Sequence, residues 1–392
     1  MRAIVLSGGG AKGAYEVGVW KALRKLHIKY DIVTGTSIGA LNGMLMVQHE
    51  YYKCLRFWKN LSYEKIYDNF IPSKKAKQMY LNYLNKIIGG GIGMEKMEDM
   101  LEEYYKPHKL YSSKISFGVV AYNLSTMEVV NATKKNTRPD KLKKYILASA
   151  TCFPVFKPYK IGTDTYIDGG YYDNLPINLA IDLGADEIIA VDLGSLGLRK
   201  KIKDKKIKIT YIAPNNKLDS FLLFDSKAAK RMINLGYNDA MKTFGKLEGN
   251  LYTFKKGTIS SNHFRYKVKL RNLIESKKEF QIGNLKRFLE SRNSKNIMGI
   301  IVEDAMEIFK LKVDFIYNSI DLNWLLLDKL DDSEDMKLDA FDIDEIKKIL
   351  NRDIVVKYIY KSIKKGEKIN YKIFSFFTKE FTTAIYLLAI RS

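Results

Sequence analysis

Two glycine-rich turns near the start of the chain constrain its fold most strongly. The first, Gly8–Gly13, directly follows the apolar run Ala3–Leu6, and the second, Gly35–Gly39, directly follows Ile32–Thr34. Each turn leads into a stretch with helical apolar spacing, so each predicts a strand, a tight turn and a helix in that order. Such units stack their strands side by side and cover them with helices. The sequence therefore predicts an α/β protein with a mainly parallel central sheet.

The alternation of strands and helices continues to about residue 250 and then changes. Because alternating elements cover both faces of a parallel sheet, we expect a three-layer α/β/α domain over residues 1–250. From 251 to 392 the apolar spacing is helical, which predicts a second, mostly helical domain. Further strands are expected at 115–122, 127–131, 165–167, 187–192 and 207–212, and helices at 140–150, 177–183 and 227–244.

The second turn presents a serine as a candidate nucleophile. Gly35 stands two residues before Ser37, and Gly39 stands two residues after it. Glycine lets the backbone turn sharply, so Ser37 is expected on a strained elbow between strand and helix, with its hydroxyl exposed.

The first turn predicts an anion site that complements this nucleophile. Bare backbone N–H groups at the start of a helix bind negative charge, including the oxyanion of an acyl-transfer intermediate. We expect Gly9 and Gly10 to donate these hydrogen bonds, while Gly8 and Gly13 shape the turn. A nucleophile and an oxyanion hole are thus both predicted near the start of the chain.

A serine nucleophile needs a base, and the positions of the four histidines suit this role poorly. None of the four follows a glycine-punctuated strand, and only His263 comes late enough in the chain to serve in a histidine triad. Asp168 ends a short predicted strand and is followed by Gly169 and Gly170. Its carboxylate is expected to point into the cleft beyond the strand ends, where open parallel sheets place their sites. Asp168 is therefore the favoured base, with His263 as the alternative.

Taken in order, these blocks resemble the patatin-like phospholipase family. The matching stretches are Gly8–Gly13, Gly35–Gly39, Asp168–Gly170 and the alanine-serine segment Ala148–Pro154. The resemblance in order and spacing extends to about residue 245 and does not cover the helical region after it. The family often has Asp-Gly-Ala where this chain has Asp-Gly-Gly, and both forms are tolerated.

The resemblance implies a Ser–Asp dyad that works without histidine, metal or cofactor on phospholipid or lysophospholipid. Ser37 would attack the ester carbonyl while Asp168, its pKa raised by apolar surroundings, accepts the proton and later activates water. Lys12 would lie at the oxyanion hole, where it either meets a lipid phosphate or stays solvated.

Other functions use some of the same residues. A soluble carboxylesterase, a neutral lipase or an acyltransferase would employ the same dyad. Outside the enzymes, the first glycine turn could cradle phosphate in a nucleotide-binding protein. That alternative lacks the Gly-Lys-Ser/Thr ending of a P-loop, and Asp31 precedes the second strand instead of following it.

The formal net charge of +22 suggests contact with an anionic surface. The surplus also fits a general bias toward lysine, but no RNA-binding or helix-turn-helix pattern accompanies it, so we expect a membrane surface and no nucleic acid. Two basic stretches are candidates for that contact: 199–208, and a second one made of 133–135 and 141–144.

The first strand begins at residue 2 and no apolar run is long enough to span a bilayer, so we expect a cytoplasmic protein, at most peripheral to membranes. The two cysteines, Cys54 and Cys152, predict neither a disulfide framework nor a metal cluster.

Overall fold

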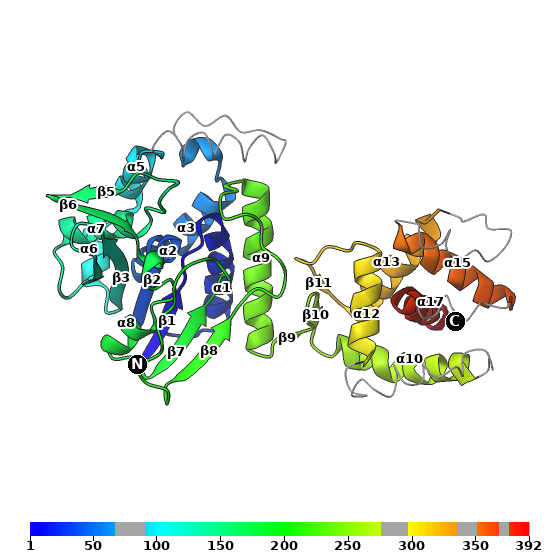
Figure 1. Ribbon diagram of the computed structural model, residues 1–392. Coiled ribbons are helices and arrows are strands. Elements are labelled where there is room, and N and C mark those ends of the chain that lie inside the picture. The colour runs from blue at the N-terminus through cyan, green and yellow to red at the C-terminus, as the bar shows by residue number, and fades with distance from the viewer. Residues whose placement is uncertain (67–90, 276–296, 335–350, 368–375, 392) are drawn as a thin grey trace. The chain divides into compact units, whose positions relative to one another are not determined.

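The computed structural model describes residues 1–66, 91–275, 297–334, 351–367 and 376–391 (Figure 1). Within these residues the chain forms two compact units, Met1–Thr243 and Phe244–Ser392. The assignment of 251–392 as a domain in its own right stays a prediction.

An eight-stranded sheet forms the centre of the first unit, in the order β5-β6-β3-β2-β1-β7-β8 with β4 paired to β3. The adjacent strands β3, β2, β1, β7 and β8 are parallel to one another, whereas β4 and β6 run antiparallel to β3, and β5 runs antiparallel to β6. The sheet is thus mainly parallel, as predicted. The strands are β1 (Arg2–Leu6), β2 (Ile32–Thr36), β3 (Ser116–Asn123), β4 (Glu128–Thr133), β5 (Tyr159–Ile161), β6 (Asp164–Asp168), β7 (Glu187–Val191) and β8 (Lys208–Ile212).

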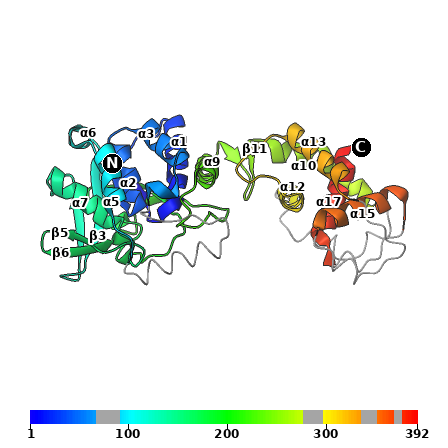
Figure 2. The same ribbon diagram turned by 90° about the horizontal axis from the view of Figure 1, so that it is seen from above.

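Helices cover both faces of this sheet, which confirms the predicted α/β class (Figures 1 and 2). Alternate residues of β1 divide between the faces: Ala3 and Val5 pack with α8, whereas Leu6 lies against Gly43 of α2. The described helical elements of this unit are η1 (Gly10–Gly13), α1 (Ala14–Lys25), α2 (Ile38–Val47), α3 (Tyr51–Lys59), η2 (Tyr63–Lys65), α5 (Glu95–Tyr104), α6 (Pro107–Ser112), α7 (Pro139–Ser149), η3 (Gly169–Tyr171), α8 (Ile177–Asp182) and α9 (Ser226–Thr243).

Two glycines bring α1 and α9 into close contact. A Cβ atom added to Gly18 would lie 2.0 Å from the carbonyl oxygen of Ile233, and one added to Gly236 would lie 2.0 Å from that of Tyr15. The helix backbones therefore touch at these points, and any larger side chain would force them apart.

Strand β3 aligns the ends of β2 and β6. Its residues 118–123 pair with β4 along one edge, so β2 and β6 share the other edge. On that edge Thr36 of β2 lies opposite Val120, and Asp168 of β6 lies opposite Ala121. The two strands run in opposite directions and their carboxyl ends therefore meet. Strand β2 ends directly before Ser37, and β6 ends at Asp168.

The second unit is mostly helical, as predicted, and also holds a three-stranded sheet. Phe381 and Tyr386 near the end of the chain are fully buried in its core. The elements are β9 (Leu247–Glu248), β10 (Thr253–Lys255), α10 (Thr258–Glu275), α12 (Ile297–Ile308), β11 (Ile316–Tyr317), α13 (Ser319–Asp332), α15 (Arg352–Lys365) and α17 (Thr378–Arg391).

None of the helices in the described part of the chain has the length and the apolar character that crossing a membrane requires.

Candidate functional site

Ser37 lies on a strained turn between β2 and α2. Its backbone has φ 57° and ψ −126°, a conformation that residues other than glycine rarely adopt. The turn needs glycine on both sides of Ser37. A Cβ added to Gly35 would lie 2.3 Å from the carbonyl oxygen of Gly39, and a Cβ added to Gly39 would lie 2.6 Å from the carbonyl oxygen of Leu6. The backbone N–H of Ser37 donates to Oγ of Ser149, at 2.9 Å. The sharp turn predicted from the sequence is therefore present.

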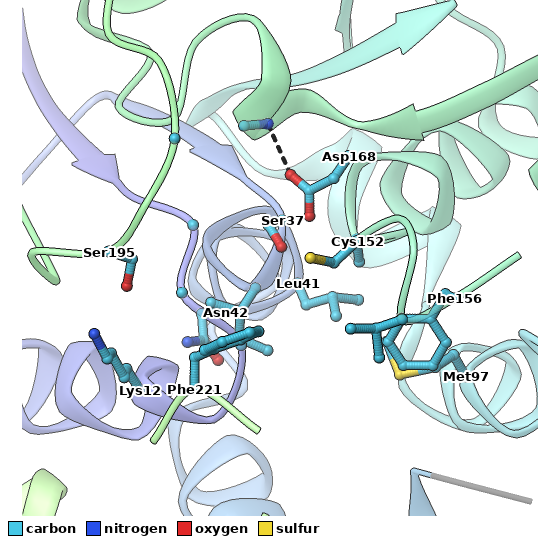
Figure 3. Close-up of a pocket in the computed structure, with 18 of the residues that line it drawn as sticks. Lys12, Ser37, Leu41, Asn42, Met97, Cys152, Phe156, Asp168, Ser195 and Phe221 are labelled. Atoms are coloured by element: carbon cyan, nitrogen blue, oxygen red, sulfur yellow. Dashed lines mark hydrogen bonds between the residues drawn. The ribbon is translucent and has the colours of Figure 1, made fainter. Parts of the chain in front are cut away.

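Asp168 is held in place at the end of β6. Its backbone N–H donates to the carbonyl of Thr151 at 2.9 Å, and its Oδ1 accepts from the N–H of Gly170 at 2.7 Å. Gly169 has no room for a side chain, since an added Cβ would lie 2.1 Å from the carbonyl oxygen of Val120. Figure 3 shows the carboxylate directed toward the hydroxyl of Ser37.

The electrostatic setting of Asp168 suits a base. The side chain is 4% exposed, and this burial raises its pKa to about 6. Hydrogen bonds from the Ser37 side chain and the Gly170 N–H oppose the rise, because they favour the charged form. The carboxylate is thus ionised at neutral pH and holds a proton more readily than an exposed aspartate.

The first glycine turn lies beside this pair and leaves two N–H groups unused. The N–H of Gly8 donates to the carbonyl of Asn174 at 3.0 Å, and that of Ala11 donates to the carbonyl of Phe221 at 2.7 Å. Among the described residues, no acceptor takes up the N–H of Gly9 or Gly10. Both glycines line the same cavity as Ser37 and Asp168, so their donors are available to a ligand there.

Lys12 and Gly13 occupy different places in this turn. Lys12 lines the cavity, and partial burial lowers its pKa. Figure 3 shows it on the same side of the cavity as Ser195, whose buried Oγ has no hydrogen-bond partner in the described part of the chain. Gly13 instead packs against the elbow, because a Cβ there would lie 2.4 Å from Cγ1 of Ile38.

A buried polar cluster contacts the end of the first glycine turn, and sequence reasoning missed it. Nδ2 of Asn42 donates to the carbonyl of Gly13 at 3.0 Å and to Oε2 of Glu16 at 2.8 Å, and its Oδ1 accepts from Nε1 of Trp58 at 3.0 Å. Complete burial raises the pKa of Glu16 to about 8, so this carboxyl is mostly protonated at neutral pH. No local motif marks these residues, because their roles depend on contacts between α1, α2 and α3.

The cavity that these residues share has a volume of about 890 Å³ and a mostly apolar lining. Ser37 and Asp168 lie where the two strand ends meet, and the helices α2, α3 and α5 supply much of the wall. This shape accepts a long apolar group next to the serine hydroxyl. The apolar lining includes Leu41, Met44, Leu45, Phe57, Trp58, Met97, Met100, Leu101, Tyr104, Val155 and Phe156.

Asn174 and Ser195 also line the cavity, although the sequence did not point to them. Nδ2 of Asn174 lies 3.4 Å from the carbonyl oxygen of Gly8, and a Cβ added at Gly170 would lie 2.9 Å from Oδ1 of Asn174. Asn174 thus connects the Asp-Gly-Gly turn to the first glycine turn. Its position six residues after Asp168 is the only sequence signal for this role, and one asparagine at that spacing is too common to be informative.

The histidines with described side chains, His27, His49 and His108, do not line the cavity. His263 belongs to α10 in the second unit, and its side chain lies outside the described residues. No group of three or more histidine, cysteine or acidic residues that could hold a metal ion occurs among the described residues.

Comparisons with known proteins find sequence relatives of the first unit. Residues 4–181 match the sequence profile of the family described as patatin-like phospholipase. Patatin-like phospholipase domain-containing protein 7 of Rattus norvegicus is 28% identical over 195 residues, which are 49% of this chain and 14% of the rat protein. Lysophospholipase nte1 of Neurospora crassa is 30% identical over 201 residues, which are 49% of this chain and 12% of the fungal protein. The matches therefore span only a small part of these long relatives.

Among solved structures, VipD from Legionella pneumophila is similar with a TM-score of 0.41 and 14% identity, covering 100% of this chain and 91% of that chain.

Proposed function

Because residues 4–181 form a patatin-like phospholipase domain, we propose that this chain is a lipid acyl hydrolase of the phospholipase A or lysophospholipase type. The observation that carries the proposal is the meeting of Ser37 and Asp168 in an apolar cavity of about 890 Å³. A nucleophile and a buried base beside space for a hydrocarbon chain suit the cleavage of an acyl ester.

The reaction proceeds through an acyl-enzyme. Asp168 accepts the proton of the Ser37 hydroxyl as Oγ attacks the ester carbonyl, and the N–H groups of Gly9 and Gly10 stabilise the oxyanion. The C–O bond to the alcohol then breaks, and Asp168 returns the proton to the departing oxygen. In the second half, Asp168 takes a proton from water as the water oxygen attacks the acyl-enzyme. The bond between the acyl carbon and Oγ then breaks, Asp168 returns the proton to Oγ of Ser37, and the fatty acid is released.

The lining of the cavity bears on the kind of ester. The apolar walls favour a long acyl chain, and Lys12 together with the Ser195 hydroxyl favours an anionic group such as a lipid phosphate. A neutral lipase, a soluble carboxylesterase and an acyltransferase would share the dyad. The first two would not need a site for an anionic group, and an acyltransferase would pass the acyl group to an acceptor other than water. A nucleotide-binding protein would not need an apolar cavity beside its glycine turn.

Product analysis tests the proposal. The wild-type chain, incubated with mixed phospholipid and lysophospholipid vesicles, is expected to release fatty acid, and the Ser37→Ala variant is expected to release none. A fluorophosphonate probe should label the wild type and the Ser195→Ala variant but not Ser37→Ala, since only an activated serine reacts. The assignment would be contradicted if the probe still labelled Ser37→Ala. It would also be contradicted if the wild-type chain released no fatty acid from vesicles of any lipid composition.

The raised pKa of Asp168 predicts the acid limb of the pH profile. The base must be ionised, and burial raises its pKa to about 6. We therefore expect kcat/KM to rise about tenfold per pH unit below pH 6 and to level off above it. Initial rates on a soluble ester between pH 4.5 and pH 8 measure this, with circular dichroism to show that the fold persists at each pH. A midpoint near pH 4 would indicate that Asp168 is not the group that titrates.

A further inference from the structure

The opening of the cavity carries large apolar side chains that are exposed to solvent. We name them the apolar rim: Phe153 (45% exposed), Tyr171 (45%), Leu196 (97%), Leu198 (61%) and Phe221 (37%), all of which line the cavity. Deeper lining residues such as Leu41 and Trp58 are almost completely buried. The cavity is thus lined by apolar side chains both in the interior and at the surface.

Exposed apolar side chains of the first unit are concentrated at this rim. Nine large apolar side chains of the first unit are exposed within the described residues, and five of these nine form the rim. The five come from four separate segments: the stretch after α7, η3, the β7–β8 loop and the β8–α9 loop. Single exposed apolar residues are ordinary, whereas a cluster around a cavity entrance marks a surface that another apolar phase covers.

The charges beside the rim are positive. Lys157, Lys201 and Lys217 are exposed, lie within four residues of a rim side chain along the chain, and form no ion pair in the described part of the structure. Two of the carboxylates near the rim along the chain are paired with arginine, Asp192 with Arg199 at 2.7 Å and Asp219 with Arg231 at 3.0 Å. The half-buried Asp225 instead accepts from the backbone N–H of Ala228. The surroundings of the rim therefore attract an anionic partner.

We propose that the apolar rim enters the hydrocarbon boundary of an anionic phospholipid membrane, with these three lysines contacting the lipid headgroups. Apolar side chains inserted at the interface and lysines beside anionic lipid both favour binding. Because the rim residues line the same cavity as Ser37, a lipid tail that enters between them reaches the serine hydroxyl directly from the bilayer. The inference rests on the proposed function, since it names the phase from which the substrate enters.

Vesicle binding by the full-length Ser37→Ala chain tests the rim without any hydrolysis. In sedimentation with vesicles of phosphatidylcholine and phosphatidylglycerol, adding Leu196→Ser and Leu198→Ser is expected to weaken binding at least about tenfold, because two leucines lose their transfer from water. The matched control is Met127→Ser, which removes a side chain that is 67% exposed and lies away from the cavity; its binding should be unchanged.

A second set of variants tests the charges. Lys157→Glu, Lys201→Glu and Lys217→Glu together should abolish the preference for phosphatidylglycerol and the weakening of binding by salt. The control Lys29→Glu changes an exposed lysine that does not line the cavity and should leave both intact. Equal binding by the rim variant and by Met127→Ser would overturn the proposal. It would also be overturned if the chain formed a dimer that the rim variant dissociates and bound no vesicles.

These outcomes separate the membrane surface from the reaction. A chain that binds vesicles through the rim but hydrolyses no lipid would refute the proposed function and retain the surface. A chain that releases fatty acid and binds equally well without its rim leucines would do the reverse.

Discussion

Replacing Ser37 by alanine or Asp168 by asparagine is expected to lower kcat by about 10⁴-fold or more, the scale on which serine hydrolases respond to the loss of nucleophile or base. Both side chains act in one proton transfer, so the double variant should be no slower than the weaker single variant. Asparagine retains an oxygen that can accept from the Gly170 N–H, so Asp168→Asn keeps that contact while removing the base. Hydrolysis of a soluble ester, measured alongside thermal unfolding, checks the effect.

Asp173→Asn is the matched control for this experiment. Asp173 is 6% exposed and burial raises its pKa to about 6, as for Asp168, but it does not line the cavity. We expect Asp173→Asn to keep most of the activity. Near-full activity in Asp168→Asn combined with its loss in His263→Ala would replace the dyad by a histidine triad.

Gly10→Ala is expected to lower kcat by about 10²–10³-fold, the cost of losing an oxyanion donor. Gly10 has φ 55°, and an added Cβ would lie 2.4 Å from the Phe221 carbonyl oxygen, which itself accepts from the N–H of Ala11. The turn must shift to admit the methyl group, and the Gly10 N–H shifts with it. Steady-state kinetics should show the loss in kcat more than in KM, because the oxyanion forms after the substrate binds.

The control for Gly10→Ala separates backbone strain from displacement. Gly162 has φ 66°, and nothing lies within 4 Å of a Cβ built there. Gly162→Ala therefore imposes a similar backbone penalty without moving a neighbour, and its kcat should match the wild type. If Gly10→Ala were equally active, the first glycine turn would have no part in catalysis.

The features that were predictable from sequence are those encoded over a few residues. The turn at Ser37 needs glycine two positions away on each side, and the predicted strands and helices of the first unit depend on short apolar patterns, so local reasoning identified them. The nearness of Asp168 to Ser37 was expected for a different reason from the one observed. A strand parallel to its neighbours would place Asp168 at their carboxyl ends, whereas β6 is antiparallel to β3 and reaches the site from the opposite direction.

The features that were not predictable depend on contacts between distant segments. The carbonyl of Phe221 that fixes the first glycine turn, the Asn42 cluster beneath it and the apolar rim each combine segments far apart in the sequence. A phenylalanine or an asparagine in isolation has no pattern that reveals such a partner. Tyr386 is the same case in the second unit, where its hydroxyl accepts from Asn262 and donates to Asn323 within the core.

Because β2 and β6 pair with the same edge of β3, catalytic activity requires that both strands pair in the correct register. Thr36 and Asp168 oppose consecutive residues of one strand, so a slip of either partner by two residues would move its end by about 7 Å. A misassembled chain would then hold an intact serine turn and an intact aspartate turn that never meet. During refolding, ester hydrolysis should therefore appear only once both β2 and β6 have paired with β3 in this register.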